Sequence, residues 1–272
     1  MSRPPLTWLY VPGDRPDRIG KALGSAADVV IVDLEDAVVA DAKADARRAA
    51  AAALQDATDA RPVQIRVNAA GTPWLADDLA MVAALPPAVG LRLPKAESAD
   101  AVREVAAGAP NRPLHLLVES AVGLEHAYDL ASSGVATIGL GEADLRADLG
   151  VSGDDGLLWA RGRIVAAAAA AGLPPPSMSV YTDVRDLVGL AASCRTGRSL
   201  GFLGRTAIHP TQLDVIRTAF TPTAEDVDRA RELLDAAEAG AAAGRGAVAL
   251  PDGRFVDEAV LRQARRVVAL AR

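Results

Sequence analysis

The sequence predicts an α/β protein built around a (β/α)8 barrel. Short β-branched runs alternate with longer alanine-rich stretches from the first residues to about Ala219, which is the rhythm of repeated βα units on a parallel sheet. The chain has 272 residues, 50% of them apolar, and a single barrel domain typically takes about 250 residues. Aromatic residues make up only 3%, so Ala, Val and Leu must fill the buried space.

Eight runs have the composition of buried strands. In chain order they are Trp8–Val11, Val29–Leu34, Val63–Asn68, Gly90–Pro94, Leu114–Glu119, Thr137–Gly141, Ser177–Tyr181 and Arg205–His209. The clearest helices between them are Asp41–Gln55, Ala99–Ala107, Leu157–Ala171 and Val184–Leu200. Eight consecutive βα units close most economically into a TIM (β/α)8 barrel. The alternative is an open doubly wound sheet, but the first turn, Val11 to Pro16, lacks the GxGxxG pattern expected there.

The composition changes after the eighth unit, which predicts a C-terminal helix–hairpin–helix extension. Thr223–Gly240 is typical of an exposed helix, Val248–Val256 of a hairpin turning at Asp252-Gly253, and Asp257–Ala271 of a last helix. We therefore expect a catalytic barrel at residues 1–220 and an extension at residues 221–272. Such surplus segments serve as lids or oligomer contacts, or simply as packing flaps.

Charge and composition exclude several classes of partner. The formal net charge of −6 is spread without long single-sign runs, so no nucleic-acid surface is expected. The longest apolar helix, at residues 164–173, is too short for a bilayer, which needs about 20 residues, and the first residues lack an export signal. Cys194 is the single cysteine, which excludes an internal disulfide and favours a small buried residue over a nucleophile. A cytoplasmic protein without a membrane partner is expected.

Charged and polar residues follow nearly every predicted strand. In a barrel these strand ends converge on one mouth. The residues are Asp33, Glu35, Asp36, Arg66, Asn68, Lys95, Glu119, Glu142, Asp144 and His209. One strand-end carboxylate more often caps a helix or meets solvent, but six charged ends favour a site for a hard metal ion and an anionic substrate. Oxygen ligands indicate magnesium, whereas zinc needs a cluster of His or Cys, and the chain has three scattered His and one Cys.

Six motifs in order along the chain resemble those of the citrate lyase beta-subunit family. They are Leu9-Tyr10-Val11-Pro12-Gly13, Asp33-Leu34-Glu35-Asp36-Ala37-Val38 followed by Lys43 and Arg47, Arg66-Val67-Asn68, Leu93-Pro94-Lys95-Ala96-Glu97-Ser98, Val118-Glu119-Ser120-Ala121 and Ile208-His209-Pro210-Thr211-Gln212. Gly253-Arg254-Phe255-Val256-Asp257 in the tail also resembles the family. The family belongs to the wider aldolase and citrate lyase superfamily, which includes malyl-, citramalyl- and citryl-CoA lyases.

The resemblance implies roles for particular residues of the mouth. Glu119 and Asp144 match the two magnesium ligands of the family. Arg66 matches the residue that holds the substrate carboxylate and steadies negative charge on the reacting oxygens. Glu35, Asp36 and Lys95 match further catalytic residues of the mouth.

The resemblance also implies a coenzyme A site and an oligomer. Arg15, Lys43 and His209 fall near where related enzymes hold coenzyme A. Asp257 matches an acid that relatives contribute from a neighbouring subunit, which would make the assembly a homotrimer or hexamer.

Two segments depart from the family pattern. Relatives often have Gly-Ala-Glu-Asp at the sixth strand, whereas this chain has Gly141-Glu142-Ala143-Asp144, so Glu142 is displaced by one position and is expected to face elsewhere. Val188 and Ser193 stand at helix positions that are usually acidic, which is expected to alter a helix contact more than the chemistry.

The function expected from these residues is that of a magnesium-dependent carbon–carbon lyase. It would cleave or form a 3-hydroxyacyl-CoA such as malyl-, citramalyl- or citryl-CoA, with an acyl-CoA and a 2-oxoacid as the other side of the reaction; with water admitted, the same site could hydrolyse the thioester. Two alternatives remain. One is a class II aldolase that acts on free hydroxy-oxoacids, and the other is a non-catalytic subunit of a lyase complex.

Overall fold

The computed structural model describes residues 3–55, 62–242, 248–249 and 255–271. The chain divides into two compact units, one of residues 5–217 and one in which residues 218–271 associate with the N-terminal residues 3–4. The larger unit carries the sheet and the strand-end residues.

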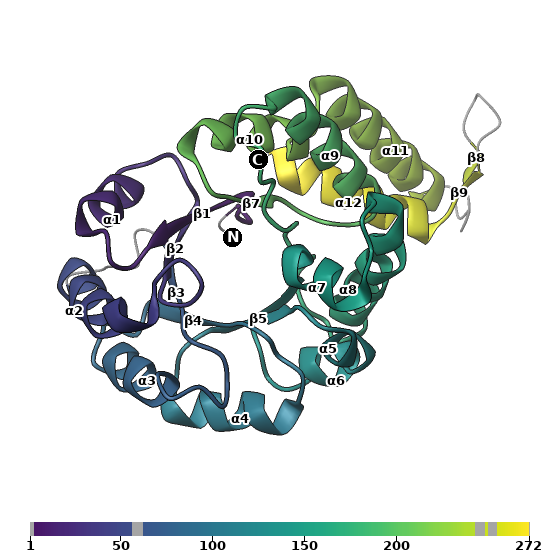
Figure 1. Cartoon of the computed structure of the whole chain (residues 1–272). Helices are drawn as coiled ribbons and strands as arrows, with labels where there is room; N and C mark the ends of the chain where they lie inside the picture. The colour runs from purple at the N-terminus through teal and green to yellow at the C-terminus, as the bar shows by residue number, and fades with distance from the viewer. Residues whose placement is uncertain (1–2, 56–61, 243–247, 250–254, 272) are drawn as a thin grey trace. The chain divides into compact units, whose positions relative to one another are not determined.

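The larger unit is a curled parallel sheet of seven strands in the order β6-β5-β4-β3-β2-β1-β7 (Figure 1). Its strands are β1 (Thr7–Pro12), β2 (Val29–Asp33), β3 (Val63–Arg66), β4 (Val89–Leu93), β5 (Leu114–Val118), β6 (Thr137–Leu140) and β7 (Arg205–Ala207). The predictions of an α/β fold and of a parallel sheet are confirmed, and seven of the eight predicted runs form its strands.

The prediction of a seventh strand at Ser177–Tyr181 is wrong. This segment makes a single parallel bridge, between Met178 and Arg205, and among the described residues no ladder joins it to β6. Three prolines at positions 174–176 precede it and have no N–H to donate to a ladder. Its carbonyl at Ser179 accepts a hydrogen bond of 2.9 Å from Nε of Arg205 rather than from a neighbouring strand. Among the described residues the sheet is therefore a half-barrel, with β6 and β7 as its two edges.

Helices surround the outer face of the curled sheet (Figure 1). The helices of this unit are α1 (Pro16–Leu23), η1 (Ala40–Ala42), α2 (Lys43–Leu54), α3 (Leu75–Ala83), α4 (Ala99–Gly108), α5 (Ala121–Glu125), α6 (Ala127–Ala131), α7 (Glu142–Leu149), η2 (Asp154–Leu157), α8 (Leu158–Ala170), α9 (Leu187–Ser199) and η3 (Pro210–Gln212), and α10 (Leu213–Phe220) follows. Several begin at side-chain caps: Asp186 accepts from the Gly189 N–H at 2.8 Å, and Ser120 from the Gly123 N–H at 3.1 Å. Each cap directs the chain out of the mouth and into the helix that follows.

Alternation along the strands separates an apolar outer face from a more polar inner face. Val30, Val32 and Ile65 are fully buried, and such residues face the helices. On the inner face Trp8, Val29 and Ile31 form a cluster, against which the partly buried Tyr10 packs. Towards the carboxyl ends of the strands the inner face becomes charged. The backbone register places Asp33, Arg66 and Arg92 side by side on three adjacent strands.

The smaller unit contains α11 (Ala224–Ala242), the antiparallel pair β8 (Val248–Ala249) and β9 (Phe255–Val256), and α12 (Glu258–Ala271). Helices α11 and α12 pack against each other. The oxygen Oδ1 of Asp257 accepts from the Val260 N–H at 3.0 Å and so caps α12. The predicted turn at Asp252-Gly253 lies outside the described residues. None of the helices in the described ranges combines the length and the apolar character that crossing a bilayer requires.

Candidate active site

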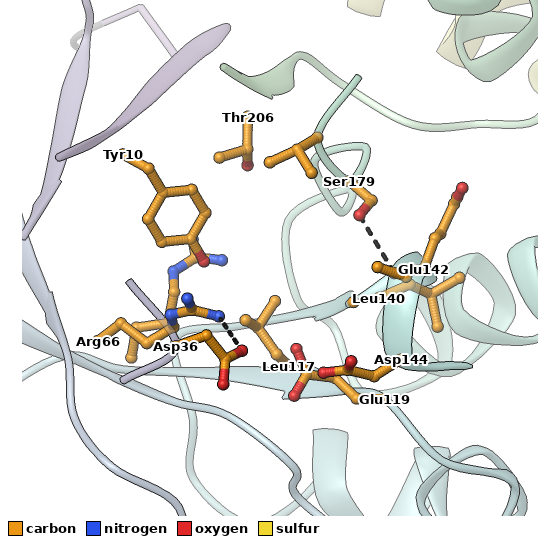
Figure 2. Close-up of a pocket in the computed structure, with 14 residues that line it drawn as sticks. Tyr10, Asp36, Arg66, Leu117, Glu119, Leu140, Glu142, Asp144, Ser179 and Thr206 are labelled. Carbon is orange, nitrogen blue, oxygen red and sulfur yellow. Dashed lines mark hydrogen bonds and ion pairs between the residues drawn. The ribbon is translucent and has the colours of Figure 1, made fainter. Parts of the chain in front are cut away.

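A pocket at the carboxyl end of the curled sheet collects side chains from most of its strands (Figure 2). Tyr10 comes from β1, Arg66 from β3 and Arg92 from β4, while Glu119 and Asp144 follow β5 and β6. The lining residues are Tyr10, Asp36, Arg66, Arg92, Leu117, Glu119, Leu140, Gly141, Glu142, Ala143, Asp144, Ser179, Val180 and Thr206. Four of the predicted site residues, Asp36, Arg66, Glu119 and Asp144, are thus among those brought together here.

Arg66 is held in one orientation by carboxylates on two sides. Its Nε and Nη2 donate to the two oxygens of Asp33 at 2.8 and 2.6 Å, a bidentate pair. Its Nη1 lies 3.0 Å from Oε2 of Glu35 and 3.6 Å from Oδ2 of Asp36. Its guanidinium carbon also stands 4.9 Å from the ring centroid of Tyr10. Burial opposes the charge, but the hydrogen bonds to Asp33 and the nearby negative groups outweigh it, and the pKa of Arg66 is raised. Arg66 is therefore a fixed, permanent cation in the pocket.

Glu35 and Lys95 form a second pair beside Arg66. Nζ of Lys95 lies 2.8 Å from Oε1 of Glu35 and 3.6 Å from Oδ1 of Asp36. Burial raises the pKa of Glu35, although the charge of Arg66 acts against this shift. The hydrogen bond to Glu35 raises the pKa of Lys95. Both oxygens of Glu35 are buried, and the charged groups of Arg66 and Lys95 are their partners.

The backbone of Lys95 links this pair to Glu119. Lys95 has φ 51°, in the left-handed region that residues with a side chain seldom occupy. In this conformation its N–H donates to Oε2 of Glu119 at 3.0 Å. Backbone outliers of this kind are concentrated at functional sites, where the surrounding structure holds them in place. One residue thus positions Glu35 through its ammonium and Glu119 through its amide.

Glu119 and Asp144 lie side by side at the opposite side of the pocket from Tyr10 (Figure 2). Glu119 is buried, and burial raises its pKa to about 7, with further increases from the charges of Glu35 and Asp144 and a decrease from Arg66. Gly141 leaves room for this carboxylate, since a Cβ at position 141 would lie 2.1 Å from Oε1 of Glu119. A buried carboxylate whose pKa is raised by burial and by neighbouring carboxylates is a favourable environment for a cation.

The pocket carries an excess of negative charge. Five carboxylates, Asp33, Glu35, Asp36, Glu119 and Asp144, lie around the cations Arg66, Arg92 and Lys95, and the buried ammonium of Lys43 interacts with the first three of them. Carboxylates therefore outnumber cations around the pocket. No cluster of three or more His, Cys, Asp or Glu suited to a metal occurs in the described ranges. A divalent magnesium ion fits, because it commonly takes one or two carboxylates and completes its shell with water and substrate oxygens.

The displaced Glu142 faces away from these two carboxylates. It is buried and makes a bidentate pair with Arg161, with Nε–Oε1 and Nη2–Oε2 distances of 2.9 and 2.7 Å. This confirms that Glu142 engages another partner while Asp144 stays in the pocket. At the other departure from the family pattern, Ser193 accepts from Nη1 of Arg205 at 2.9 Å, and Val188 is 82% exposed. Arg205 therefore has a neutral partner on α9.

Six predicted site residues stand outside the pocket lining: Glu35 and Lys95, which pair with each other beside Arg66, and Arg15, Lys43, His209 and Asp257. Arg15 and His209 follow β1 and β7, which are neighbours in the sheet; Arg15 is 3.4 Å from Asp17, and His209 bonds Thr211 at 2.8 Å. Lys43 is buried, and its Nζ donates to the carbonyls of Leu34 and Glu35 at 2.7 Å each.

These positions leave the coenzyme A role of all three as a prediction. For Lys43 they add a structural role, because its ammonium holds the loop that carries Glu35. Asp257 caps α12 in the smaller unit. Its contribution to a neighbouring subunit also stays a prediction.

Two lining residues, Tyr10 and Arg92, escaped the sequence prediction. Both lie inside strands, whereas the predicted site residues of the sheet lie at or after strand ends. Arg92 stands between Leu91 and Leu93 in an otherwise apolar strand. A lone charge at an inward-facing strand position is the signal that could have found it, because a buried charge must be paired or used.

Glu119→Gln is expected to stabilise the metal-free protein at pH 8. The pKa of Glu119 is raised from 4.5 to about 7 in the folded protein. The contribution of its protonated side chain to folding stability is therefore complete below pH 4.5 and is lost as the pH rises towards 7. Above that range the ionised carboxylate lowers the free energy of unfolding by about 3 kcal/mol, at 1.36 kcal/mol per pKa unit. A glutamine carries no charge and keeps an oxygen for the Lys95 N–H.

Urea unfolding in EDTA at pH 5 and pH 8 measures this effect. The variant should gain stability over the wild type chiefly at pH 8. Glu104→Gln, at an exposed position on α4, is the matched control and should show no pH-dependent difference. Equal effects of Glu119→Gln at both pH values would contradict the expected titration.

Comparisons with known proteins cover nearly the whole chain. Residues 6–210 match the protein family described as HpcH/HpaI aldolase/citrate lyase. The citrate lyase subunit beta-like protein of Deinococcus radiodurans is 37% identical over 285 residues, 99% of this chain and 99% of that protein. The (3S)-malyl-CoA thioesterase of Cereibacter sphaeroides is 36% identical over 97% of this chain and 93% of its own. Protein CitE of Mycobacterium tuberculosis, crystallised with magnesium, acetoacetate and coenzyme A, has 35% identity and a TM-score of 0.84 over 99% of this chain and 98% of its own.

Proposed function

Because this chain belongs to the HpcH/HpaI aldolase/citrate lyase family, we propose that it is a magnesium-dependent carbon–carbon lyase that cleaves or forms a 3-hydroxyacyl-CoA. The observation that carries the proposal is the meeting of Arg66, Glu119 and Asp144 in one pocket. A relative named as a citrate lyase beta-like protein and a similar structure holding magnesium and coenzyme A support it. The products of cleavage would be an acyl-CoA and a 2-oxoacid.

Glu119 and Asp144 are the residues that would hold magnesium. Both carboxylates face the pocket, and carboxylates outnumber cations around them, which suits a divalent ion. When bound, magnesium supplies Lewis-acid polarisation of the substrate oxygens.

Arg66 would bind the carboxylate beyond the hydroxyl carbon and steady negative charge on the reacting oxygens. Asp33 already orients the guanidinium of Arg66, so this group needs little reorganisation when negative charge develops on the substrate oxygens. The hydroxyl proton would pass to a carboxylate of the mouth, for which Glu35 and Asp36 lie beside Arg66. The bond between the hydroxyl carbon and the thioester α-carbon then breaks, and its electron pair becomes the thioester enolate. Lys95 holds Glu35 in place for this transfer.

Arg15, Lys43 and His209 are proposed contacts of coenzyme A. Arg15 and His209 lie on loops after neighbouring strands and are exposed enough to meet a large thioester. Lys43 would act through the loop it holds. We propose further that residues 1–220 form the catalytic barrel domain and residues 221–272 a lid and oligomer contact. Asp257 would complete the mouth of an adjoining subunit in a homotrimer or hexamer in the cytoplasm.

Hydrolysis of the thioester is a second candidate function. A relative named (3S)-malyl-CoA thioesterase, 36% identical over 97% of this chain, favours it. The same pocket could serve both reactions. In hydrolysis, water attacks the thioester carbonyl, either after the carbon–carbon bond has broken or in place of that cleavage.

A screen of malyl-, citramalyl- and citryl-CoA with and without magnesium tests these functions. A lyase releases a 2-oxoacid while coenzyme A stays acylated, and a thioesterase releases the free thiol, so following both products separates the two. Turnover of pyruvate and aldehydes without coenzyme A would indicate a class II aldolase. Neither turnover nor binding of magnesium and acyl-CoA would contradict the proposal and favour a non-catalytic subunit.

A further inference from the structure

A second buried arginine lies in the pocket beside Arg66. Arg92 is the register partner of Arg66 on the next strand, so the two side chains project from the same face of the sheet. Arg92 is 5% exposed and lines the pocket. The pocket thus contains two guanidinium groups at adjacent positions, only one of which the proposed reaction uses.

The two arginines differ in their partners. Arg66 is matched by three carboxylates, of which Asp33 holds it bidentately. Arg92 donates through Nε to Oε1 of Gln64 at 2.9 Å and has the Tyr10 hydroxyl as a further side-chain partner. Within the part of the chain that the structure describes, no carboxylate forms an ion pair with Arg92.

A buried cation with neutral partners is costly unless something offsets it. Burial lowers the pKa of Arg92, and the charge of Arg66 lowers it further, while Tyr10 and Glu119 act in the opposite direction. A charge left without an opposite charge at low exposure is destabilising, and the usual compensation is a bound counter-ion. A guanidinium in a pocket wall is well suited to a carboxylate, which it can bind through two parallel hydrogen bonds.

Tyr10, the hydroxyl partner of Arg92, stands across the pocket from the proposed metal ligands (Figure 2). In Figure 2, Tyr10 and Thr206 lie across the pocket from Glu119 and Asp144, with Arg66 and Leu117 between the two sides. A substrate whose first carboxylate meets Arg66 therefore has Arg92 and Tyr10 as further hydrogen-bond donors in the same pocket. In a 3-hydroxyacyl-CoA, the group that can reach a second position is the branch on the hydroxyl carbon.

We propose that Arg92, with Tyr10, receives a second carboxylate carried by the branch on the hydroxyl carbon of the substrate. This inference rests on the proposed lyase function and names its substrate class: thioesters whose 2-oxoacid half is a dicarboxylate. A branch that is a hydrogen or a methyl group leaves Arg92 unpaired in the complex. A site built to bind a polar group discriminates strongly against an analogue that lacks it.

The test compares substrates that differ only in this branch. Citryl-CoA carries a carboxymethyl branch and citramalyl-CoA a methyl branch. The wild type should favour citryl-CoA. Arg92→Met should lower kcat/KM for citryl-CoA by about 100-fold, which is the size of one charge-assisted hydrogen bond. The same variant should change kcat/KM for citramalyl-CoA by less than about 5-fold. Arg92→Lys keeps the charge and should retain part of the preference.

Binding gives a readout independent of turnover. Calorimetry with magnesium present should show that Arg92→Met weakens oxaloacetate, a 2-oxo dicarboxylate, and leaves pyruvate nearly unchanged. Arg103→Met, at an exposed position on α4, is the matched control and should change neither. The methionine removes an uncompensated buried charge, so thermal unfolding should show a folded protein.

Two results separate the possible failures. Equal losses on both substrates, or an undiminished preference for the carboxymethyl branch in Arg92→Met, would overturn the role of Arg92. A wild-type protein that cleaves none of the thioesters with magnesium would instead contradict the lyase function itself.

Discussion

Glu119→Gln and Asp144→Asn are each expected to abolish magnesium-dependent cleavage while the protein stays folded. Both changes remove a negative charge at the proposed metal ligands and retain the shape of the side chain. The pocket then has one negative charge fewer to offset a divalent ion. The loss of Lewis-acid and electrostatic stabilisation should lower kcat/KM by about 1,000-fold or more, several kcal/mol of transition-state stabilisation.

The measurement combines activity with magnesium titration. Steady-state cleavage across a wide magnesium range, together with calorimetric magnesium binding, distinguishes weakened metal affinity from an impaired chemical step. Glu104→Gln and Asp129→Asn, both at exposed positions on helices, are matched controls that should behave as the wild type. Full activity in both Glu119→Gln and Asp144→Asn would remove these residues as metal ligands.

Arg66→Lys is expected to lower turnover by about 100- to 1,000-fold, the usual cost of removing one preorganised electrostatic donor, with coenzyme A affinity unchanged. Lysine keeps the charge but cannot span the two oxygens of Asp33 and still present a fork to the substrate. Single-turnover kinetics and calorimetry with coenzyme A measure the two quantities separately. An unchanged rate would exclude Arg66 from the chemistry.

Arg66→Ala should lose turnover as well, but it leaves the buried Asp33 without its partner. Breaking one side of a buried ion pair commonly costs about 3–5 kcal/mol of stability. The double variant Arg66→Ala with Asp33→Asn removes the orphaned charge. It should recover much of the thermal stability without recovering activity, and a return of activity would show that Arg66 acts only through folding.

Sequence patterns predicted the parts of the fold that local physics determines. β-branched runs and strand-end charges identified seven strands and placed Arg66, Glu119 and Asp144 at one end of a parallel sheet. The run at Ser177–Tyr181 has the composition of a strand, but its backbone partners depend on what lies next to it. There the backbone of Met178 alone bridges to β7, and the Arg205 side chain bonds the carbonyl of Ser179.

Contacts that depend on tertiary packing could not be predicted in the same way. Lys43 is a helix-start lysine in sequence, and nothing local indicates that its ammonium turns inward to two carbonyls. Arg92 and Tyr10 face the pocket because of strand register, which is set by the neighbouring strands rather than by their own segments. The assignment of Glu119 and Asp144 as magnesium ligands came from the family resemblance, which strand composition alone does not supply, and it stays a prediction.

Gly141 limits how this pocket can be redesigned. The Glu119 carboxylate occupies the space beside this glycine, and its Oε1 lies only 2.1 Å from where a Cβ would stand. Directed-evolution libraries aimed at new substrates can vary the apolar wall at Leu117 and Leu140. Even alanine at position 141 would clash with the Glu119 carboxylate and displace it. The smallest residue in the pocket is thus as restricted in sequence space as the charged group it accommodates.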